Sequence, residues 1–187
     1  CEDFTIIGAY KLLVDSSGKG NGSKAKFEEN IKKLGVFFTN TELNAVFKRF
    51  DADGDGNISL REFEHTILPV SMSYTRLIRL RTEEQRISSG TLTQLVELIK
   101  TIGNVEYALE DLRFRLTRRV SLEDAFRSLD CREKGFVDIA EFKNLLAKYS
   151  FYVGSKDLET IRNRIDLNED GMISVSEFSH TMSPSKQ

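Results

Sequence analysis

Two stretches of the chain set oxygen-bearing side chains at alternate positions around a glycine. One reads DADGDGNISLRE over residues 51–62, and the other reads DLNEDGMISVSE over residues 166–177. Each has oxygen donors at its first, third, fifth and ninth positions and a glutamate at its twelfth. The glycine at the sixth position allows the sharp turn that lets such donors converge, because glycine adopts positive φ at little cost. Converging carboxylates repel one another unless a cation lies between them, so both stretches are candidate metal sites.

The order of the donors indicates which metal. Calcium takes about six to eight oxygen ligands, and a twelve-residue loop supplies them from positions 1, 3, 5, 7, 9 and 12. Both stretches match that loop, D-x-[DN]-x-[DN]-G-x5-E. On this motif the chain resembles the EF-hand calcium-binding superfamily, in a two-lobed, calmodulin-like form, over all of its length except residues 72–118. An acidic turn without metal is the alternative, and two full matches within a repeat argue against it.

The resemblance implies a set of calcium ligands in each loop. In one loop they are Asp51, Asp53, Asp55, the carbonyl of Asn57, Ser59 and Glu62. In the other they are Asp166, Asn168, Asp170, the carbonyl of Met172, Ser174 and Glu177. The serine at position 9 acts through water in this scheme. The first set contains four carboxylates and the second contains three, so we expect the loop at Asp51 to bind calcium no more weakly than the loop at Asp166.

Two further windows repeat the layout with altered donors. They are DSSGKGNGSKAK, residues 15–26, and DCREKGFVDIAE, residues 130–141. Within each half of the chain the two windows start 36 residues apart, and the halves are offset by 115 residues. A two-loop unit has therefore been used twice, which predicts two lobes of paired loops. The repeat is also the basis for expecting a longer parent protein with further units of this kind.

Basic residues replace oxygen donors in both altered windows. Arg132 and Lys134 stand at the third and fifth positions of one window. Lys19 and Lys26 stand at the fifth and twelfth positions of the other. An ammonium or guanidinium group has no oxygen to offer a metal ion. We therefore expect neither window to bind calcium, so that each lobe holds one ion.

The altered windows remain structural partners of the intact loops under this resemblance. Paired loops of the family meet through a short β-contact at position 8. Val137 should therefore lie opposite Ile173, and Gly22 should lie opposite Ile58. Position 8 usually has an apolar side chain, so we expect the contact at Gly22 to be the weaker of the two.

Apolar residues at helical spacing precede the loops. Before Asp51 they are Leu43, Val46, Phe47 and Phe50, and before Asp130 they are Leu122, Ala125, Phe126 and Leu129. The i, i+3, i+4, i+7 spacing places each set on one face of a helix. The predicted fold is all-α, with two EF-hand pairs joined by a helical hairpin segment. The predicted domains are residues 1–71, 72–118 and 119–187.

The segment between the lobes has two apolar stripes of its own. They cover residues 92–102 and 105–116, and Gly103–Asn104 interrupts the pattern, which predicts two helices in a hairpin. The segment is basic, with nine Lys or Arg between Arg76 and Arg119 against six Asp or Glu. One interpretation is a surface for an acidic protein partner, formed by Arg76, Arg79, Arg113, Arg115, Arg118 and Arg119. The alternative is that these arginines cap and solvate helices.

Composition argues against several classes of protein. A net charge of −2 gives no support for nucleic-acid binding, and no stretch approaches the ~18 apolar residues of a membrane span. Two cysteines, Cys1 and Cys131, are too few for a disulfide framework and indicate free thiols in a reducing, cytoplasmic compartment. No nucleophile–base motif, phosphate loop or zinc spacing is found in the sequence, so we expect no enzymatic activity.

Two roles are consistent with a calcium-binding chain of this kind. One is a component of a larger cytoskeletal or axonemal assembly, because the layout resembles tandem EF-hand proteins of ciliary axonemes. The other is a calcium sensor that changes its contacts with a target when it binds the ion. Broad-range sensors use methionine-rich grooves, whereas this chain has three methionines. The assembly role is therefore the first expectation.

Overall fold

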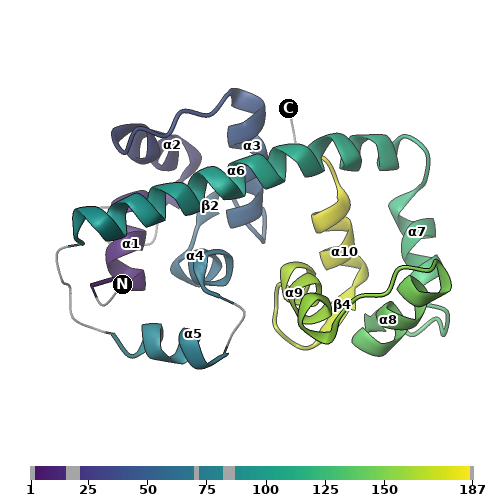
Figure 1. Cartoon of the computed structure of the whole chain (residues 1–187). Coiled ribbons are helices and arrows are strands. Elements are labelled where there is room, and N and C mark those ends of the chain that lie inside the picture. The colour runs from purple at the N-terminus through teal and green to yellow at the C-terminus, as the bar shows by residue number, and fades with distance from the viewer. Residues whose placement is uncertain (1–2, 16–21, 70–71, 82–86, 186–187) are drawn as a thin grey trace. The chain divides into compact units, whose positions relative to one another are not determined.

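The computed structural model describes residues 3–15, 22–69, 72–81 and 87–185. Within them the fold is all-α, as predicted, and the strands form two short antiparallel pairs (Figure 1). The chain divides into two compact units, one of residues 1–110 and 185–187 and one of residues 111–184. The domain limits expected at residues 71 and 118 stay a prediction.

The first unit holds two helix–loop–helix motifs and further helical segments. Its elements are α1 (Ile6–Leu13), β1 (Gly22–Ser23), α2 (Lys24–Lys33), α3 (Asn40–Phe50), β2 (Asn57–Ile58), α4 (Leu60–Ile67), α5 (Met72–Arg79) and the larger part of α6 (Ser89–Thr117). Capping boxes at Thr39 and Ser59 start α3 and α4. Such boxes satisfy the N–H groups at the start of a helix and so fix where it begins.

Three phenylalanines form the centre of the core of the first unit. Phe27, Phe50 and Phe63 come from α2, α3 and α4 and are fully buried. The rings of Phe50 and Phe63 stack with centroids 5.8 Å apart, and the ring of Phe27 lies 5.4 Å from that of Phe50. Burying a side chain of this type contributes about 1.5–3 kcal/mol. The helices on both sides of the loop at Asp51 are thereby held in place.

A single helix, α6, runs where the sequence predicted a hairpin (Figure 1). The predicted break at Gly103–Asn104 is wrong, because both residues lie inside α6. A glycine inside a helix costs about 1 kcal/mol relative to alanine, which long flanking helical stretches can offset. The glycine has a packing role instead, since a Cβ on Gly103 would come within 2.4 Å of the Phe38 ring. Among the helices of the described residues, α6 included, none has the length and apolar composition needed to cross a membrane.

The second unit repeats the pair of helix–loop–helix motifs. After the end of α6 its elements are α7 (Leu122–Leu129), β3 (Phe136–Asp138), α8 (Ile139–Lys148), α9 (Ser155–Ile165), β4 (Met172–Ser174) and α10 (Val175–Met182). The rings of Phe126 and Phe178 lie 5.7 Å apart in its core. This core is less closed than that of the first unit. Phe27 is fully buried, whereas Phe142, at the equivalent place in the repeat, is only partly buried.

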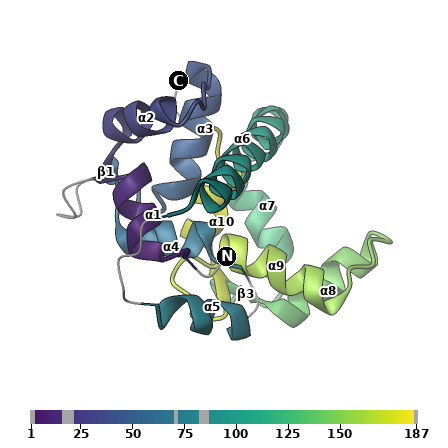
Figure 2. The ribbon, with the colours of Figure 1, turned by 60° about the vertical axis from the view of Figure 1, so that its left-hand side comes forward.

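The paired loops meet at the residues expected from position 8. Val137 lies opposite Ile173 in the β3–β4 pair, and Gly22 lies opposite Ile58 in the β1–β2 pair. Figure 2 shows β1 at the entry to α2. A Cβ on Gly22 would lie 2.0 Å from a methyl carbon of Val14, which is fully buried. Val14 therefore fills the space that an apolar side chain at position 8 would take.

Candidate metal centre

The loop between α3 and α4 brings three carboxylates together. Asp51 follows the last residue of α3, and carboxylate oxygens of Asp51, Asp53 and Asp55 lie within 4.8 Å of one another. Gly54 and Gly56 have positive φ angles of 74° and 86°, which turn the backbone between these residues. Carboxylates at alternate positions of the sequence therefore lie close together in space.

Backbone N–H groups hold one oxygen of each of these carboxylates. Oδ2 of Asp51 accepts from the N–H of Gly56 at 3.1 Å. Oδ1 of Asp53 accepts from Asp55 at 3.0 Å, and Oδ1 of Asp55 accepts from Asn57 at 2.7 Å. The second oxygen of Asp51, Oδ1, is buried and has no hydrogen-bond partner among the described residues. Because a buried charged oxygen without a partner is costly, the arrangement fits a cation.

Glu62 closes the loop from the other side. Its Oε1 accepts from the N–H groups of Ala52 and Asp53 at 2.8 and 3.2 Å. Its Oε2 accepts from the N–H and the hydroxyl of Ser59 at 2.8 and 2.6 Å, which forms the capping box of α4. One carboxylate therefore ties the start of the loop to the start of the exit helix. The Ser-x-x-Glu spacing is a capping signal that could have predicted this second role from sequence.

The loop between α9 and α10 repeats the aspartate contacts. Oδ2 of Asp166 accepts from the N–H of Gly171 at 2.9 Å, and Oδ1 of Asp170 accepts from Met172 at 2.8 Å. The third position differs, because Asn168 donates its side-chain N–H to Oδ2 of Asp170 at 3.0 Å. That bond occupies an oxygen of Asp170. Because an asparagine stands at the third position, this loop has one carboxylate fewer for a metal ion than the loop at Asp51.

Glu177 has the same position in its loop as Glu62 has in the other. Its Oε1 accepts from the N–H of Leu167 at 3.0 Å, and its Oε2 accepts from the hydroxyl of Ser174 at 2.7 Å. Ser174 and Glu177 form the capping box of α10. The two intact loops are thus built alike at the twelfth position, as their shared spacing predicts.

The first carboxylate of each intact loop has a raised pKa. Burial raises the pKa of Asp51, and the negative charge of Glu62 raises it further. Burial likewise raises the pKa of Asp166, with a further contribution from the charge of Glu177. A cation beside each group would favour its charged form and oppose both effects.

The third loop places cations where the intact loops have donors. Lys134 Nζ lies 2.8 Å from Oε2 of Glu141 and 3.0 Å from Oδ2 of Asp138. Arg132 Nε lies 3.5 Å from Oε1 of Glu141. These ion pairs support the expectation that the loop does not bind calcium, which stays a prediction. The sequence showed the basic residues but not that they turn toward the carboxylates of their own loop.

The first loop is described only in part. Residues 16–21, and with them the substitution at Lys19, lie outside the described residues. Asp15 is buried, and Lys26 at the twelfth position forms an ion pair of 3.2 Å with Glu29 on α2. The expectation that this loop does not bind calcium therefore rests on the sequence, where lysines replace two donors, and stays a prediction.

One of the arginines expected to face a partner is not at the surface. Arg113 is buried and donates its Nε–H to the carbonyl of Thr181 at 2.8 Å. Its assignment to a surface for an acidic partner is wrong, because the guanidinium binds the end of α10 instead. An arginine inside an apolar helical stripe gives no sequence signal that separates these two outcomes.

The other arginines of that set are exposed. Arg79 and Arg115 form ion pairs with acidic residues of their own units at 3.3 and 2.7 Å. The guanidinium of Arg118 lies 4.5 Å from the centroid of a phenylalanine ring. Arg76 and Arg119 are exposed as well. Part of the set thus solvates and pairs with its own helices, as the alternative interpretation expects.

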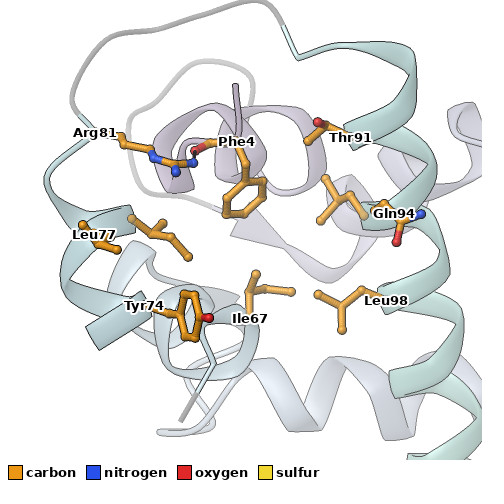
Figure 3. Close-up of a pocket in the computed structure, with 10 residues that line it drawn as sticks. Phe4, Ile67, Tyr74, Leu77, Arg81, Thr91, Gln94 and Leu98 are labelled. Carbon is orange, nitrogen blue, oxygen red and sulfur yellow. Dashed lines mark hydrogen bonds between the residues drawn. The ribbon is translucent and has the colours of Figure 1, made fainter. Parts of the chain in front are cut away.

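A cavity of about 390 Å³ lies between α5 and α6 in the first unit (Figure 3). Phe4, Ile67 and Leu98 point into it, and Arg81 donates Nη1–H to the carbonyl of Phe4 at 3.2 Å. Its lining is mainly apolar. The cavity therefore lacks the cluster of oxygen donors that both intact loops present.

Two protein-family models match the chain. A model of an EF-hand domain pair matches residues 119–183, and a model of an EF hand matches residues 43–68. Each matched segment contains one of the intact loops. The matches therefore cover the two stretches where the oxygen donors gather.

Three similar proteins are calcium-binding or calmodulin-like by name. The chain is 31% identical over 140 residues to the putative calcium-binding protein CML19 of Oryza sativa subsp. japonica, which covers 73% of this chain and 92% of that protein. It is 22% identical over 172 residues to calmodulin-like protein 2 of Arabidopsis thaliana, covering 91% and 86%. It is 30% identical over 143 residues to the flagellar calcium-binding protein TB-44A of Trypanosoma brucei brucei, covering 72% and 34%.

Proposed function

This chain belongs to the EF-hand calcium-binding superfamily, and we propose that it binds two calcium ions, one in each lobe, as a fixed component of a larger protein assembly. The proposed ligands in the first lobe are Asp51, Asp53, Asp55, the carbonyl of Asn57, Ser59 and Glu62. Those in the second lobe are Asp166, Asn168, Asp170, the carbonyl of Met172, Ser174 and Glu177. The buried, unpartnered oxygen of Asp51 supports the first site, and the equivalent contacts of Glu62 and Glu177 support the second by analogy.

The observation that carries the assembly role is that α6 covers an apolar face of the first lobe. Leu95 and Ile99 of α6 are buried in the same core as Phe47 and Ile67. A sensor has to offer an apolar groove to its target when calcium binds. Here the chain's own helix fills that face, so calcium in this lobe would stabilise an existing arrangement.

Exposed apolar residues on α6 support contact with a protein partner. Val105, Tyr107, Leu112 and Phe114 are each 43–53% exposed. The exposed Arg76 and Arg119 would add contacts with an acidic partner.

The names of the similar proteins support the proposed cytoskeletal or ciliary location and the proposed role in calcium binding. One of them is named for the flagellum, which supports a cytoskeletal or ciliary assembly, although this chain covers only 34% of that protein. The others are named as calcium-binding or calmodulin-like proteins. Those names support a role in binding without catalysis.

A calcium sensor is the second candidate, and the second lobe favours it. Its core contains only five buried apolar residues, and Phe142, Ile161 and Met182 pack against them while partly exposed. A lobe of this kind could change its exposed apolar surface when its one intact loop binds calcium. The two candidates therefore differ in how much apolar surface calcium exposes.

An environment-sensitive dye separates the two candidates. We expect calcium to raise the melting temperature of the full chain while the fluorescence of bound dye changes little. The Glu62→Gln/Glu177→Gln double variant is the control, because calcium should change neither its melting temperature nor the dye fluorescence. A large calcium-dependent increase in dye fluorescence, absent from the control, would reject the assembly role in favour of the sensor.

A further inference from the structure

We propose that Lys134 is a tethered cation that takes the place of calcium in the third loop and thereby positions the paired fourth loop for its ion. This inference rests on the proposed calcium site at Asp166. It assigns to a residue outside that site a part in setting its affinity.

The first step is the environment of the lysine. Its Nζ lies between Oε2 of Glu141 at 2.8 Å and Oδ2 of Asp138 at 3.0 Å. It also lies 4.4 Å from the centroid of the Phe136 ring, within the range of a cation–π contact. Asp138 and Glu141 occupy the ninth and twelfth positions of their loop. The ammonium thus bridges the two loop positions through which an intact loop closes on calcium.

The second step is what happens to the glutamate at the twelfth position. Oε1 of Glu62 accepts two backbone N–H groups, and Oε1 of Glu177 does the same. Oε1 of Glu141 is buried and has no hydrogen-bond partner among the described residues, and Arg132 Nε lies 3.5 Å away. The side chain of Glu141 is only 12% exposed. Oε2 of Glu141 keeps a backbone contact, since it accepts from the N–H of Asp138 at 3.2 Å. At Oε1, however, the guanidinium of Arg132 lies where Glu62 and Glu177 accept backbone N–H groups, and Lys134 balances the charge from the Oε2 side.

The third step connects the two loops. In the β3–β4 pair, Asp138 lies opposite Met172, and Phe136 lies opposite Ser174. Asp138 and Phe136 are two of the groups that contact the lysine. Met172 is the proposed carbonyl donor of the fourth loop. Ser174 holds Oε2 of Glu177 through its hydroxyl at 2.7 Å. Loss of the lysine contacts would therefore loosen the strand against which both groups are placed.

The sign of the effect separates this proposal from simple electrostatics. A positive charge near a calcium site repels the ion, so removing any nearby lysine should increase the affinity slightly. Under the proposal, removing Lys134 has the opposite effect. The fourth loop should lose affinity because its neighbouring strand is no longer held.

The experiment measures calcium binding to the fourth loop alone, by calorimetry of full-length chains that all contain Glu62→Gln. Lys134→Met removes the charge and keeps the length of the side chain. Lys143→Met is the matched control, because Lys143 is an exposed lysine on α8 of the same unit. We expect the dissociation constant to rise about fivefold or more in Lys134→Met, that is by about 1 kcal/mol. Lys143→Met should leave it unchanged or slightly lower, and Lys134→Arg should preserve most of the affinity.

A second variant tests the same idea when Lys134→Met does not fold. Arg132→Asp with Lys134→Asn restores oxygen donors at positions 3 and 5 of the third loop, so a calcium ion should replace the tethered cation. We expect one additional calcium per chain and near-normal affinity in the fourth loop. Equal affinities in Lys134→Met and Lys143→Met, or no additional calcium in the double variant, would overturn the proposal. If the Glu62→Gln chain itself takes up no calcium, the proposed site at Asp166 is the part that fails.

Discussion

At the scale of single residues, the twelfth-position glutamates connect metal chemistry to folding. Glu62 accepts from both the start of its loop and the start of α4, and Glu177 does so at α10. These hydrogen bonds hold the proposed bidentate ligand of each ion at its loop. Glutamine at the same position can keep a neutral capping contact while it removes the charge.

Replacing these glutamates one at a time should remove one calcium ion each. We expect Glu62→Gln and Glu177→Gln to weaken calcium binding in the altered loop about tenfold or more, because each loses a charged ligand. The loop at Asp51 has more carboxylates, so the site lost in Glu62→Gln should be as tight as the remaining one or tighter. Calorimetry measures both constants. Glu159→Gln, on an exposed face of α9, is the control and should retain both sites.

Acid should weaken calcium binding through the buried aspartates. Because the pKa values of Asp51 and Asp166 are raised in the folded chain, the calcium-free protein binds protons that the unfolded chain has already lost. The stability of the calcium-free form should therefore fall as the pH rises above the usual carboxyl range of about 4. Calcium has to displace those protons, so its affinity should decrease as the pH falls from neutral toward the usual carboxyl range of about 4. An affinity that stays constant over this range, measured by titration at fixed ionic strength, would contradict the argument.

The proposed metal ligands follow from sequence alone, because the loop motif assigns each of them by its position within twelve residues. The same reasoning could not predict what the long basic side chains do. Lys134 reaches Glu141 through rotamers that depend on the folded loop, and Arg113 is buried against Thr181 from α10, far along the chain. A charge pattern gives the sign of the net charge of a segment. The neighbours in the folded structure decide which of its charged side chains remain exposed.

At the scale of secondary-structure elements, α6 shows how packing can override a local break signal. Gly103–Asn104 is typical of a turn in sequence, yet α6 continues through it. The ring of Phe38 occupies the space beside Gly103 that any larger residue would need. The glycine is therefore explained by a neighbour in space and not by the conformation of its own backbone.

Alanine at Gly103 should destabilise the first unit although alanine favours helices. The added Cβ would lie 2.4 Å from the Phe38 ring, and overpacking of this kind costs about 1–3 kcal/mol. Gly90→Ala is the matched control in the same helix, because the nearest neighbour of a Cβ there would be the hydroxyl oxygen of Ser88 at 3.9 Å. It should be neutral or gain up to about 1 kcal/mol from helix propensity. Chemical denaturation of both variants tests the contrast, and equal stability would refute the packing role.

The all-α fold and the register of the β-contacts followed from sequence because each rests on a short, regular spacing. The i, i+3, i+4, i+7 pattern marks the helix before Asp51, and position 8 of each loop marks Val137 and Ile173 as partners. The hairpin prediction failed because two apolar stripes separated by a short interruption are consistent with one continuous helix as well as with two helices. The sequence also could not predict the close approach of Gly22 and Val14, because these residues come from different parts of the fold.

At the scale of the whole molecule, each compact unit contains one intact loop and one altered loop. The first unit has the larger core, which includes Leu95 and Ile99 of α6, and the second has a smaller core around Phe126 and Phe178. Calcium should therefore act on each unit through a single loop. A ligand that binds only the folded form adds about 2.7 kcal/mol at a hundredfold excess over its dissociation constant.

Hydrogen exchange should show that calcium binding in each loop stabilises only the unit that contains that loop. In the unaltered chain we expect calcium to increase amide protection in both units. Glu62→Gln should abolish the increase in the first unit only, and Glu177→Gln should abolish it in the second only. Mass spectrometry of peptides from the two units makes the comparison within one sample. Loss of protection in both units from either single change would mean that the units do not respond independently.

The most direct test of the account is a calcium titration of the full chain with the metal counted at saturation. Two ions per chain are expected, and none should bind tightly once Glu62→Gln and Glu177→Gln are combined. Failure of the unaltered chain to take up calcium, or uptake that persists in the combined variant, would contradict the assignment of the sites to the loops at Asp51 and Asp166.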